Sequence, residues 1–165
     1  MFISSDTNIW IDFFEIHHLE HPFLLEHKYY LSSAAYHDEL IKSEELRTTL
    51  LQLGLNRASI TEDEFLMAKG FMTAYRRLSV YDCIALAIAK ARSWILLSGD
   101  KPLRKAAECE GVECHGIIWI YDELLHQAKI SKVEYREVLL SLRISVQNGR
   151  CRLPIEELEN RLELL

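Results

Sequence analysis

The first part of the chain places short apolar runs before stretches with apolar residues at helical spacing, a pattern that indicates strands followed by helices. Residues 2–5 predict a short buried strand that ends at Asp6. The helix expected directly after it carries apolar side chains at Ile9, Trp10, Phe13 and Phe14. Residues 28–34 predict a second strand, and residues 37–53 predict a helix with an apolar stripe that Gly54 ends.

Residues 15–27, between these two units, are mostly polar and contain four of the seven histidines. We expect a solvated, partly mobile loop. His17 and His21 are one helical turn apart and could bind a metal ion, but no third ligand has a matching position.

A short strand over residues 58–60 leads to a helix over about 62–74, whose start is marked by the capping box of Thr61 and Glu64. Residues 82–92 are rich in alanine and isoleucine and apolar on more than one face. They predict a helix at the centre of the fold.

Residues 94–98 form a continuous apolar run, which is typical of a strand covered on both faces of a sheet. Asp100 is expected to open the next helix, with Pro102 in its first turn, and residues 116–120 predict a last strand. This alternation predicts right-handed crossovers and a three-layer α/β/α, Rossmann-like fold with a mostly parallel sheet.

The end of the chain is expected to be helical. Ser131 and Glu134 form a second capping box, and Pro154 starts an amphipathic helix. We see no linker or repeat, and a length of 165 residues fits a single domain over residues 1–165.

The composition, 49% hydrophobic and 27% charged, is that of an ordinary globular protein. No apolar run approaches the roughly 18 residues that cross a bilayer, and no cleavable leader precedes the first strand. We therefore expect a cytoplasmic protein with no membrane association. The four cysteines are expected to be reduced thiols. A zinc site at Cys109, Cys114 and His115 is a weaker alternative, because it lacks a fourth ligand.

Four acidic residues carry the candidate chemistry: Asp6, Glu39, Asp82 and Asp100. Each lies where a predicted strand gives way to a helix or just inside that helix. Because ligands bind beyond the carboxyl ends of parallel strands, one sheet could bring all four together. Hard oxygen ligands favour Mg²⁺ or Mn²⁺, so the pattern predicts a site for one or two divalent ions.

Each acid also has a purely structural explanation. Asp6, Asp82 and Asp100 stand where helix N-caps are expected, and Glu39 could be a solvated acid in the first turn of its helix. Only the combination of the four favours a metal site. The choice of Glu39 has two alternatives nearby, Asp38 and Glu44.

Neighbouring residues could support such a site. Asn8 and Ser98 could hydrogen-bond a metal ligand or a water molecule. Three basic residues that follow Asp100 could hold substrate phosphates or simply be solvated: Lys101, Arg104 and Lys105. The net charge of −6 argues against a generic nucleic-acid-binding module, although two divalent ions would reduce it to about −2.

These motifs resemble the PIN-domain nucleases over about residues 2–125. The family's opening Asp-x-Asn is similar to Asp6-Thr7-Asn8, its helix glutamate to Glu39, its aspartate before an alanine-rich helix to Asp82, and its last motif to Ser98-Gly99-Asp100. The resemblance implies hydrolysis of phosphodiester bonds, usually in RNA, that depends on Mg²⁺ or Mn²⁺.

Within the family, the short chain with Asp122 and Arg152-Leu153-Pro154 is similar to the VapC-type toxins of bacterial toxin–antitoxin pairs. That similarity implies a homodimer and a small antitoxin protein that blocks the site. The helical extension over about residues 126–165 is longer than a minimal domain needs, and it could serve dimerisation or antitoxin docking.

Two other functions compete with a metal-dependent ribonuclease. A non-catalytic PIN-like interaction protein would have no need of all four acids. A phosphatase of the haloacid dehalogenase type would also open with an aspartate after the first strand, but it needs a second aspartate two residues later, where this chain has Asn8.

Overall fold

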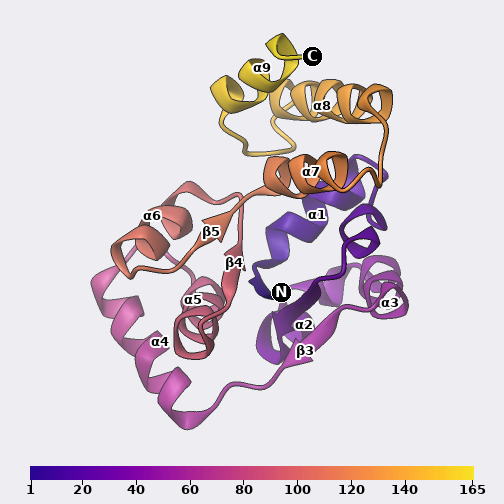
Figure 1. Cartoon of the computed structure of the whole chain (residues 1–165). Coiled ribbons are helices and arrows are strands. Elements are labelled where there is room, and N and C mark those ends of the chain that lie inside the picture. Colours follow the sequence, from indigo (N-terminus) through magenta and orange to yellow (C-terminus); the bar gives the residue numbers. More distant parts are fainter.

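The computed structural model describes the backbone of residues 1–165 and every side chain except that of Lys42. Across these residues a central sheet of five parallel strands runs through the molecule in the order β3-β2-β1-β4-β5 (Figure 1). The strands are β1 (Phe2–Ser5), β2 (Lys28–Ser32), β3 (Asn56–Ala58), β4 (Ile95–Leu97) and β5 (Cys114–His115). The predicted α/β fold is confirmed, and the sheet is parallel throughout.

The strand order reverses between β1 and β4. After β1 the chain adds β2 and β3 on one side of it, and then returns to add β4 and β5 on the other side. Ser5 at the end of β1 pairs with Leu31 of β2 on one side and with Leu97 of β4 on the other. The carboxyl ends of the two central strands therefore lie side by side. In open α/β sheets such a reversal leaves a crevice where ligands bind.

Two hydrophobic cores cover the two faces of the sheet. The first is formed by α1 (Thr7–Glu15), α3 (Glu44–Leu53) and α7 (Ile117–His126), with α8 (Lys132–Gln147) packed beyond them. The second is formed by α4 (Glu62–Ala74), α5 (Val80–Arg92) and α6 (Lys101–Cys109). Seven residues of α5 in succession are buried, which confirms a central position for this helix.

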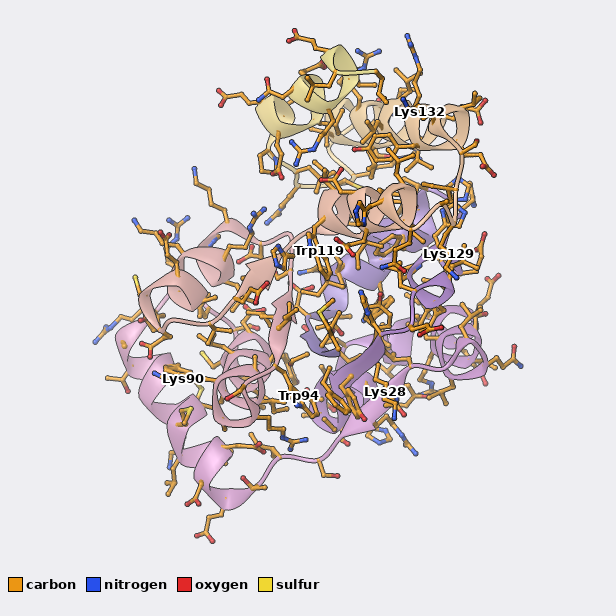
Figure 2. The ribbon with its side chains drawn as sticks, in the orientation of Figure 1. Lys28, Lys90, Trp94, Trp119, Lys129 and Lys132 are labelled. Atoms are coloured by element: carbon orange, nitrogen blue, oxygen red, sulfur yellow. The ribbon has the colours of Figure 1, made fainter. Side chains whose placement is uncertain are left out.

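Figure 2 shows the edge of the sheet where the strands begin, with Trp94 and Lys28 near one another. Trp94 stacks on Phe2 with ring centroids 5.6 Å apart, and the Lys28 ammonium lies 5.7 Å from the centre of the Phe2 ring. Aromatic packing thus closes the edge opposite the carboxyl ends.

The helix predicted over residues 37–53 is wrong in its bounds. The chain instead forms α2 (Ser33–Asp38), a 3₁₀ turn η2 (Leu40–Lys42) and then α3. Two serines explain the division, because the Ser32 side chain accepts from the N–H of Ala35 and that of Ser43 accepts from the N–H of Leu46. Each serine starts its own helix. The left-handed Gly54 ends α3 as predicted, with φ +110°.

The strand predicted over residues 116–120 is also wrong, because this segment begins helix α7 and the last strand is Cys114–His115. A short apolar run does not distinguish a buried strand from a buried helix. Burial continues at helical spacing through Tyr121 to Leu124, between α1 and α8, so the segment is the inner face of a helix.

The prediction of a solvated loop over residues 15–27 is wrong as well. This segment contains a 3₁₀ turn, η1 (His21–Leu24), and buries four side chains at Ile16, Leu19, Pro22 and Leu25. The strand expected over residues 58–60 lies two residues earlier, as β3. Packing against the body of the protein decides where these short segments lie. The local pattern of apolar residues carries no information about that packing.

The last two helices, α8 and α9 (Ile155–Glu163), stack on α7 at the orange and yellow end of the chain (Figure 1). Both predicted starts are confirmed, with the capping box at Ser131 and Pro154 before α9. Asp122 of α7 joins the three helices, because it accepts hydrogen bonds from Tyr135 of α8 and Arg161 of α9. None of the described helices is long and apolar enough to cross a membrane.

Candidate active site

Asp6 occupies the position where the strand order reverses. Its backbone N–H donates to the carbonyl of Leu97 across the strand ends (3.2 Å), and the residue is only 4% exposed. One carboxylate oxygen caps α1 by accepting from the N–H of Ile9 (2.9 Å), while the other accepts from the Ser98 hydroxyl. Asp6 is therefore both a helix cap and a buried acid at the strand reversal.

Ser98 links Asp6 to Asp100. Its hydroxyl oxygen accepts a hydrogen bond from the backbone N–H of Asp100 at 3.0 Å, and its hydroxyl group donates a hydrogen bond to Asp6. Ser98 is fully buried. Asp100 caps α6 through the N–H of Leu103 (3.0 Å) and is half-buried. The loop after β4 thus aligns the two acids.

Glu39 reaches the same region from the end of α2, rather than from the first turn of a helix. Its carboxylate accepts from the hydroxyl of Thr7, the residue directly after Asp6. Of the two alternatives, Asp38 accepts from the Tyr81 hydroxyl (2.9 Å), and Glu44 lies in the first turn of α3. Glu39 is the one of the three with a hydrogen bond to Thr7, the first residue of α1.

Asp82 is not the N-cap that its sequence position suggested. Ser79 caps α5, and Asp82, three residues later, completes a capping box by accepting from the Ser79 N–H at 2.8 Å. The negative charge of Asp82 nevertheless acts on both Asp6 and Glu39 and raises the pKa of each. The charge of Asp82 on α5 therefore reaches two of the other three predicted acids, one after β1 and one at the end of α2.

Burial raises the pKa of Asp6 from 3.8 to about 7, opposed by the hydrogen bonds from Ser98 and Ile9 and assisted by the charges of Asp82 and Asp12. The pKa of Glu39 is raised for the same main reason, partial burial of its carboxylate. Gathered acids with raised pKa values repel one another when no cation is present. Among the described residues, no three of the four acids bring carboxylate oxygens within 4.8 Å of one another, so the set would have to tighten around a bound ion.

Asp12 is an acid of this region that the sequence prediction missed. It is 7% exposed, and burial raises its pKa to about 6, opposed by a hydrogen bond from the Cys151 thiol. A β-carbon placed on Gly99 would lie 3.7 Å from an Asp12 oxygen and 3.6 Å from the carbonyl of Arg152. The segment between α8 and α9 therefore packs against the Ser98-Gly99-Asp100 loop.

A signal for Asp12 was present in the sequence, since an acid stands on the apolar stripe of α1, where Ile9, Phe13 and Ile16 are buried. Asn8, which we expected to support the site, is exposed and makes no hydrogen bond through its side chain among the described residues. Cys109, Cys114 and His115 do not gather three ligand atoms within 4.8 Å in the described part of the chain. The weaker zinc alternative thus gains no support.

A groove of about 1210 Å³ begins at Asp100 and runs between α6 and the segment before α9. Its lining includes five basic side chains: Arg77, Lys101, Arg104, Lys105 and Arg152. None of the five forms an ion pair with a described side chain. The other three acids do not line the groove, so the acids and the basic groove meet at Asp100.

A five-stranded parallel sheet, with acids gathered where its strand order reverses, defines this chain as an α/β protein with a PIN-like fold. The fold is similar to that of a PilT N-terminus domain protein from the hyperthermophilic archaeon Sulfolobus solfataricus, with a TM-score of 0.50 and 15% sequence identity over 76% of this chain and 94% of that chain. The model of the DUF3368 family, a PIN domain, matches residues 2–165, and the chain belongs to this family. No curated protein shows significant similarity to it.

Proposed function

We propose that this protein is a metal-dependent ribonuclease that uses Asp6, Glu39, Asp82 and Asp100 to hold one or two Mg²⁺ or Mn²⁺ ions. The observation that carries the proposal is Asp6, a buried carboxylate at the strand reversal, joined through Ser98 to Asp100 and acted on by the charge of Asp82. Membership of the PIN-domain family supports it, because PIN domains are typically nucleases.

The donor set fits a hard divalent ion, since all four side chains offer carboxylate oxygens. Two of them, Asp6 and Glu39, have raised pKa values, and a nearby cation would lower both by favouring the ionised form. When bound, such an ion activates water for attack on phosphorus and stabilises negative charge on the phosphate.

The protein's own residues orient the acids. Ser98 donates a hydrogen bond to one oxygen of Asp6, and the other oxygen accepts from the N–H of Ile9 in the first turn of α1. Thr7 donates a hydrogen bond to Glu39. Partners of this kind fix the direction of a ligand and its basicity. Thr7 and Ser98 thereby reduce the freedom of the Glu39 and Asp6 carboxylates.

The basic groove is suited to the phosphates of the RNA on either side of the scissile bond. Lys101 and Arg104 follow Asp100 on α6, and Arg152 faces them from the segment before α9. Arg104 approaches the loop after β4, because a β-carbon placed on Gly116 would lie 3.5 Å from its guanidinium and 3.7 Å from the Ser98 carbonyl. Local positive charge offsets the net charge of −6 where the substrate would bind.

The test compares wild type, Asp6→Asn and the control Asp63→Asn on a mixed set of structured and unstructured RNAs in Mg²⁺, Mn²⁺ or EDTA. Asp63 is an exposed acid in the first turn of α4, away from the groove. Cleavage by wild type and Asp63→Asn, lost in Asp6→Asn and in EDTA, is the expected result. A small phosphomonoester in parallel separates a ribonuclease from a phosphatase.

If Asp6→Asn cleaves RNA as fast as wild type, the activity comes from a contaminant or from another site, and the proposal fails. If none of the proteins cleaves RNA and calorimetry detects no Mn²⁺ binding, a non-catalytic PIN-like interaction protein becomes the better description.

We further propose that the protein acts in the cytoplasm as the VapC-like toxin of a toxin–antitoxin pair, as a homodimer silenced by a small antitoxin. The extension formed by α8 and α9, anchored to α7 through Asp122, is the surface we expect to be used for dimerisation or antitoxin docking. Induction of the protein alone should arrest growth, and co-expression of the neighbouring open reading frame should relieve the arrest. Unaffected growth would remove the toxin assignment and leave the nuclease assignment standing.

A further inference from the structure

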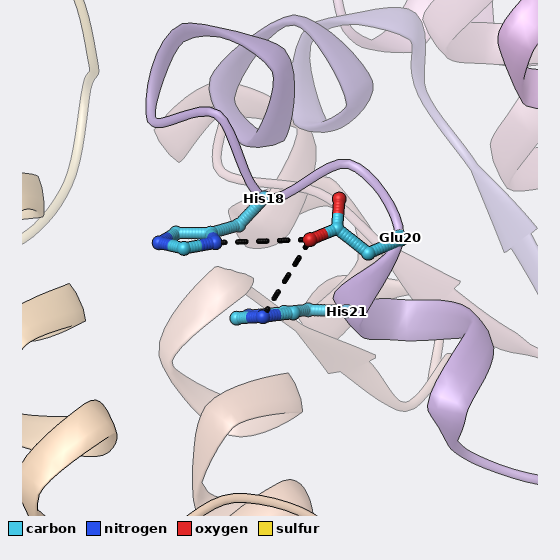
Figure 3. Close-up of side chains that lie close together, drawn as sticks. All are labelled: His18, Glu20 and His21. Atoms are coloured by element: carbon cyan, nitrogen blue, oxygen red, sulfur yellow. Dashed lines mark ion pairs between the residues drawn. The ribbon is translucent and has the colours of Figure 1, made fainter.

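A second group of possible metal ligands lies far from the acids, in the segment from the end of α1 to the first residue of η1. His18, Glu20 and His21 each present one ligand atom within 4.8 Å of the other two, and among the described residues they are the only three that do so (Figure 3). A Glu20 oxygen lies 3.9 Å from Nδ1 of His18 and 3.8 Å from Nε2 of His21. The two rings stack with centroids 4.2 Å apart.

The backbone that carries these ligands is folded rather than loose. Ile16 and Leu19 are each 6% exposed and anchor the segment in the first core. Hydrogen bonds from the His18 N–H to the carbonyl of Phe13 (3.0 Å) and from the His21 N–H to that of His18 (3.2 Å) close the turn. The ligands therefore start from a defined arrangement, which lowers the entropy cost of binding an ion.

The second nitrogen of His21 has its own partner. Nδ1 of His21 lies 3.2 Å from the hydroxyl oxygen of Tyr121, and Tyr121 is fully buried in α7. When Nδ1 donates to this oxygen, Nε2 presents a lone pair toward Glu20 and His18. Metal-binding histidines typically use their other nitrogen in this way, which fixes the ring and its tautomer.

We propose that His18, Glu20 and His21 bind a divalent transition-metal ion of the Zn²⁺ class, with Tyr121 positioning His21. Two imidazoles and one carboxylate are a known set of three protein ligands for zinc, which leaves a fourth position for water. Zn–N and Zn–O distances of about 2.0–2.2 Å in a tetrahedral site imply ligand atoms about 3.4 Å apart. The Glu20 oxygen lies 3.8 and 3.9 Å from the two nitrogens, within about 0.5 Å of that separation. Because the two rings stack almost in parallel, the His18 ring would turn out of the stack so that both nitrogens point at one ion.

This site is distinct from the candidate active site in position and in preference. α1 runs from Asp6 back along the sheet for nine residues, about 13 Å, and the histidines follow its far end. Imidazole ligands favour zinc and its neighbours, whereas carboxylates alone suit Mg²⁺. A bound ion would tie the segment before η1 to α7 through Tyr121, so we assign it a structural role that is independent of nuclease activity.

The experiment strips the full-length protein with a chelator, saturates it with Mg²⁺ to occupy the acids, and titrates Zn²⁺ by calorimetry and Co²⁺ by visible absorption. Wild type should bind one equivalent of Zn²⁺ and show the intense visible bands of tetrahedral Co²⁺. His18→Ala and Glu20→Gln should lose those bands and weaken Zn²⁺ affinity by more than about 100-fold. Tyr121→Phe should weaken it by about tenfold, within the range for lost orienting partners.

Two controls locate the ion. His126→Ala removes an exposed histidine at the end of α7 and should bind Zn²⁺ as wild type does, as should Asp6→Asn. Circular dichroism of every variant checks that the fold is retained, and Glu20 is exposed enough that Glu20→Gln leaves no buried gap. Absence of Zn²⁺ binding in Mg²⁺-saturated wild type, or equal affinity in a folded Glu20→Gln variant, would overturn the proposal.

Discussion

The replacement Asp6→Asn is expected to stabilise the metal-free protein at alkaline pH. Burial raises the pKa of Asp6 from 3.8 to about 7, so the folded protein holds this proton more tightly than the unfolded chain does. The free energy of unfolding therefore falls as the pH rises from about 4 to 7. Each pKa unit corresponds to about 1.4 kcal/mol, so the ionised Asp6 costs about 4 kcal/mol above pH 7.

The measurement is urea unfolding followed by circular dichroism, for wild type and Asp6→Asn, in EDTA at pH 5 and pH 8. About 2.5 kcal/mol of the cost develops between these two pH values. Asp6→Asn should therefore gain about that much on wild type when the pH is raised. Asp12, whose pKa is also raised, to about 6, is present in both proteins, so its contribution largely cancels in the comparison.

Mn²⁺ should reverse the stability gain of Asp6→Asn over wild type. A cation at the acids stabilises the ionised Asp6 carboxylate in wild type, whereas the variant offers the cation one ligand fewer. A difference between the two proteins that is the same at pH 5 and pH 8 in EDTA would refute the reasoning. It would mean that water reaches Asp6 in the folded protein and that burial does not hold its proton.

Three further changes test other parts of the structure. Ser98→Ala removes the hydroxyl that donates to Asp6, and the Mg²⁺ concentration for half-maximal RNA cleavage should rise by about 10- to 100-fold; an unchanged value would deny Ser98 an orienting role. Arg161→Met removes a two-pronged, partly exposed ion pair with Asp122 (3.1 and 2.9 Å). The free energy of unfolding measured in urea should fall by about 1 kcal/mol. Equal stability would show that α9 is held by apolar packing alone. Gly54→Ala forces a side chain onto a residue with φ +110° and should lower the free energy of unfolding by about 1 kcal/mol, measured as a lower midpoint of thermal unfolding; an unchanged midpoint would mean that the turn relaxes.

Position along the chain was enough to predict that Asp6 and Asp100 would follow the carboxyl ends of two strands of one sheet. Both follow buried strands that the apolar pattern identified, and parallel strands bring their carboxyl ends to one edge. The capping boxes at Thr61 and Ser131 were predicted for a similar reason, since each depends on side chains three residues apart.

Contacts between distant segments were beyond this kind of prediction. The apolar residues 116–120 fit a strand or a helix equally well, and only packing against α1 and α8 makes them the start of α7. Helical spacing had suggested only the pair His17 and His21, within a segment expected to be a solvated loop. The grouping of His18 with Glu20 and His21 depends on the folded turn and on Tyr121, 100 residues away from His21. The approach of Arg152 to Gly99 is likewise a tertiary contact.

The sequence by itself determined the alternation of strands and helices and the order of the acids, because periodicity and capping act over a few residues. The tertiary structure decided which charges are buried and which lie close to one another. It buries Asp6, it places Asp82 where its charge raises the pKa of Glu39, and it forms a basic groove beside Asp100. Burial and the distance between charges are properties of the packed chain, and they control the pKa values on which a site of gathered carboxylates depends.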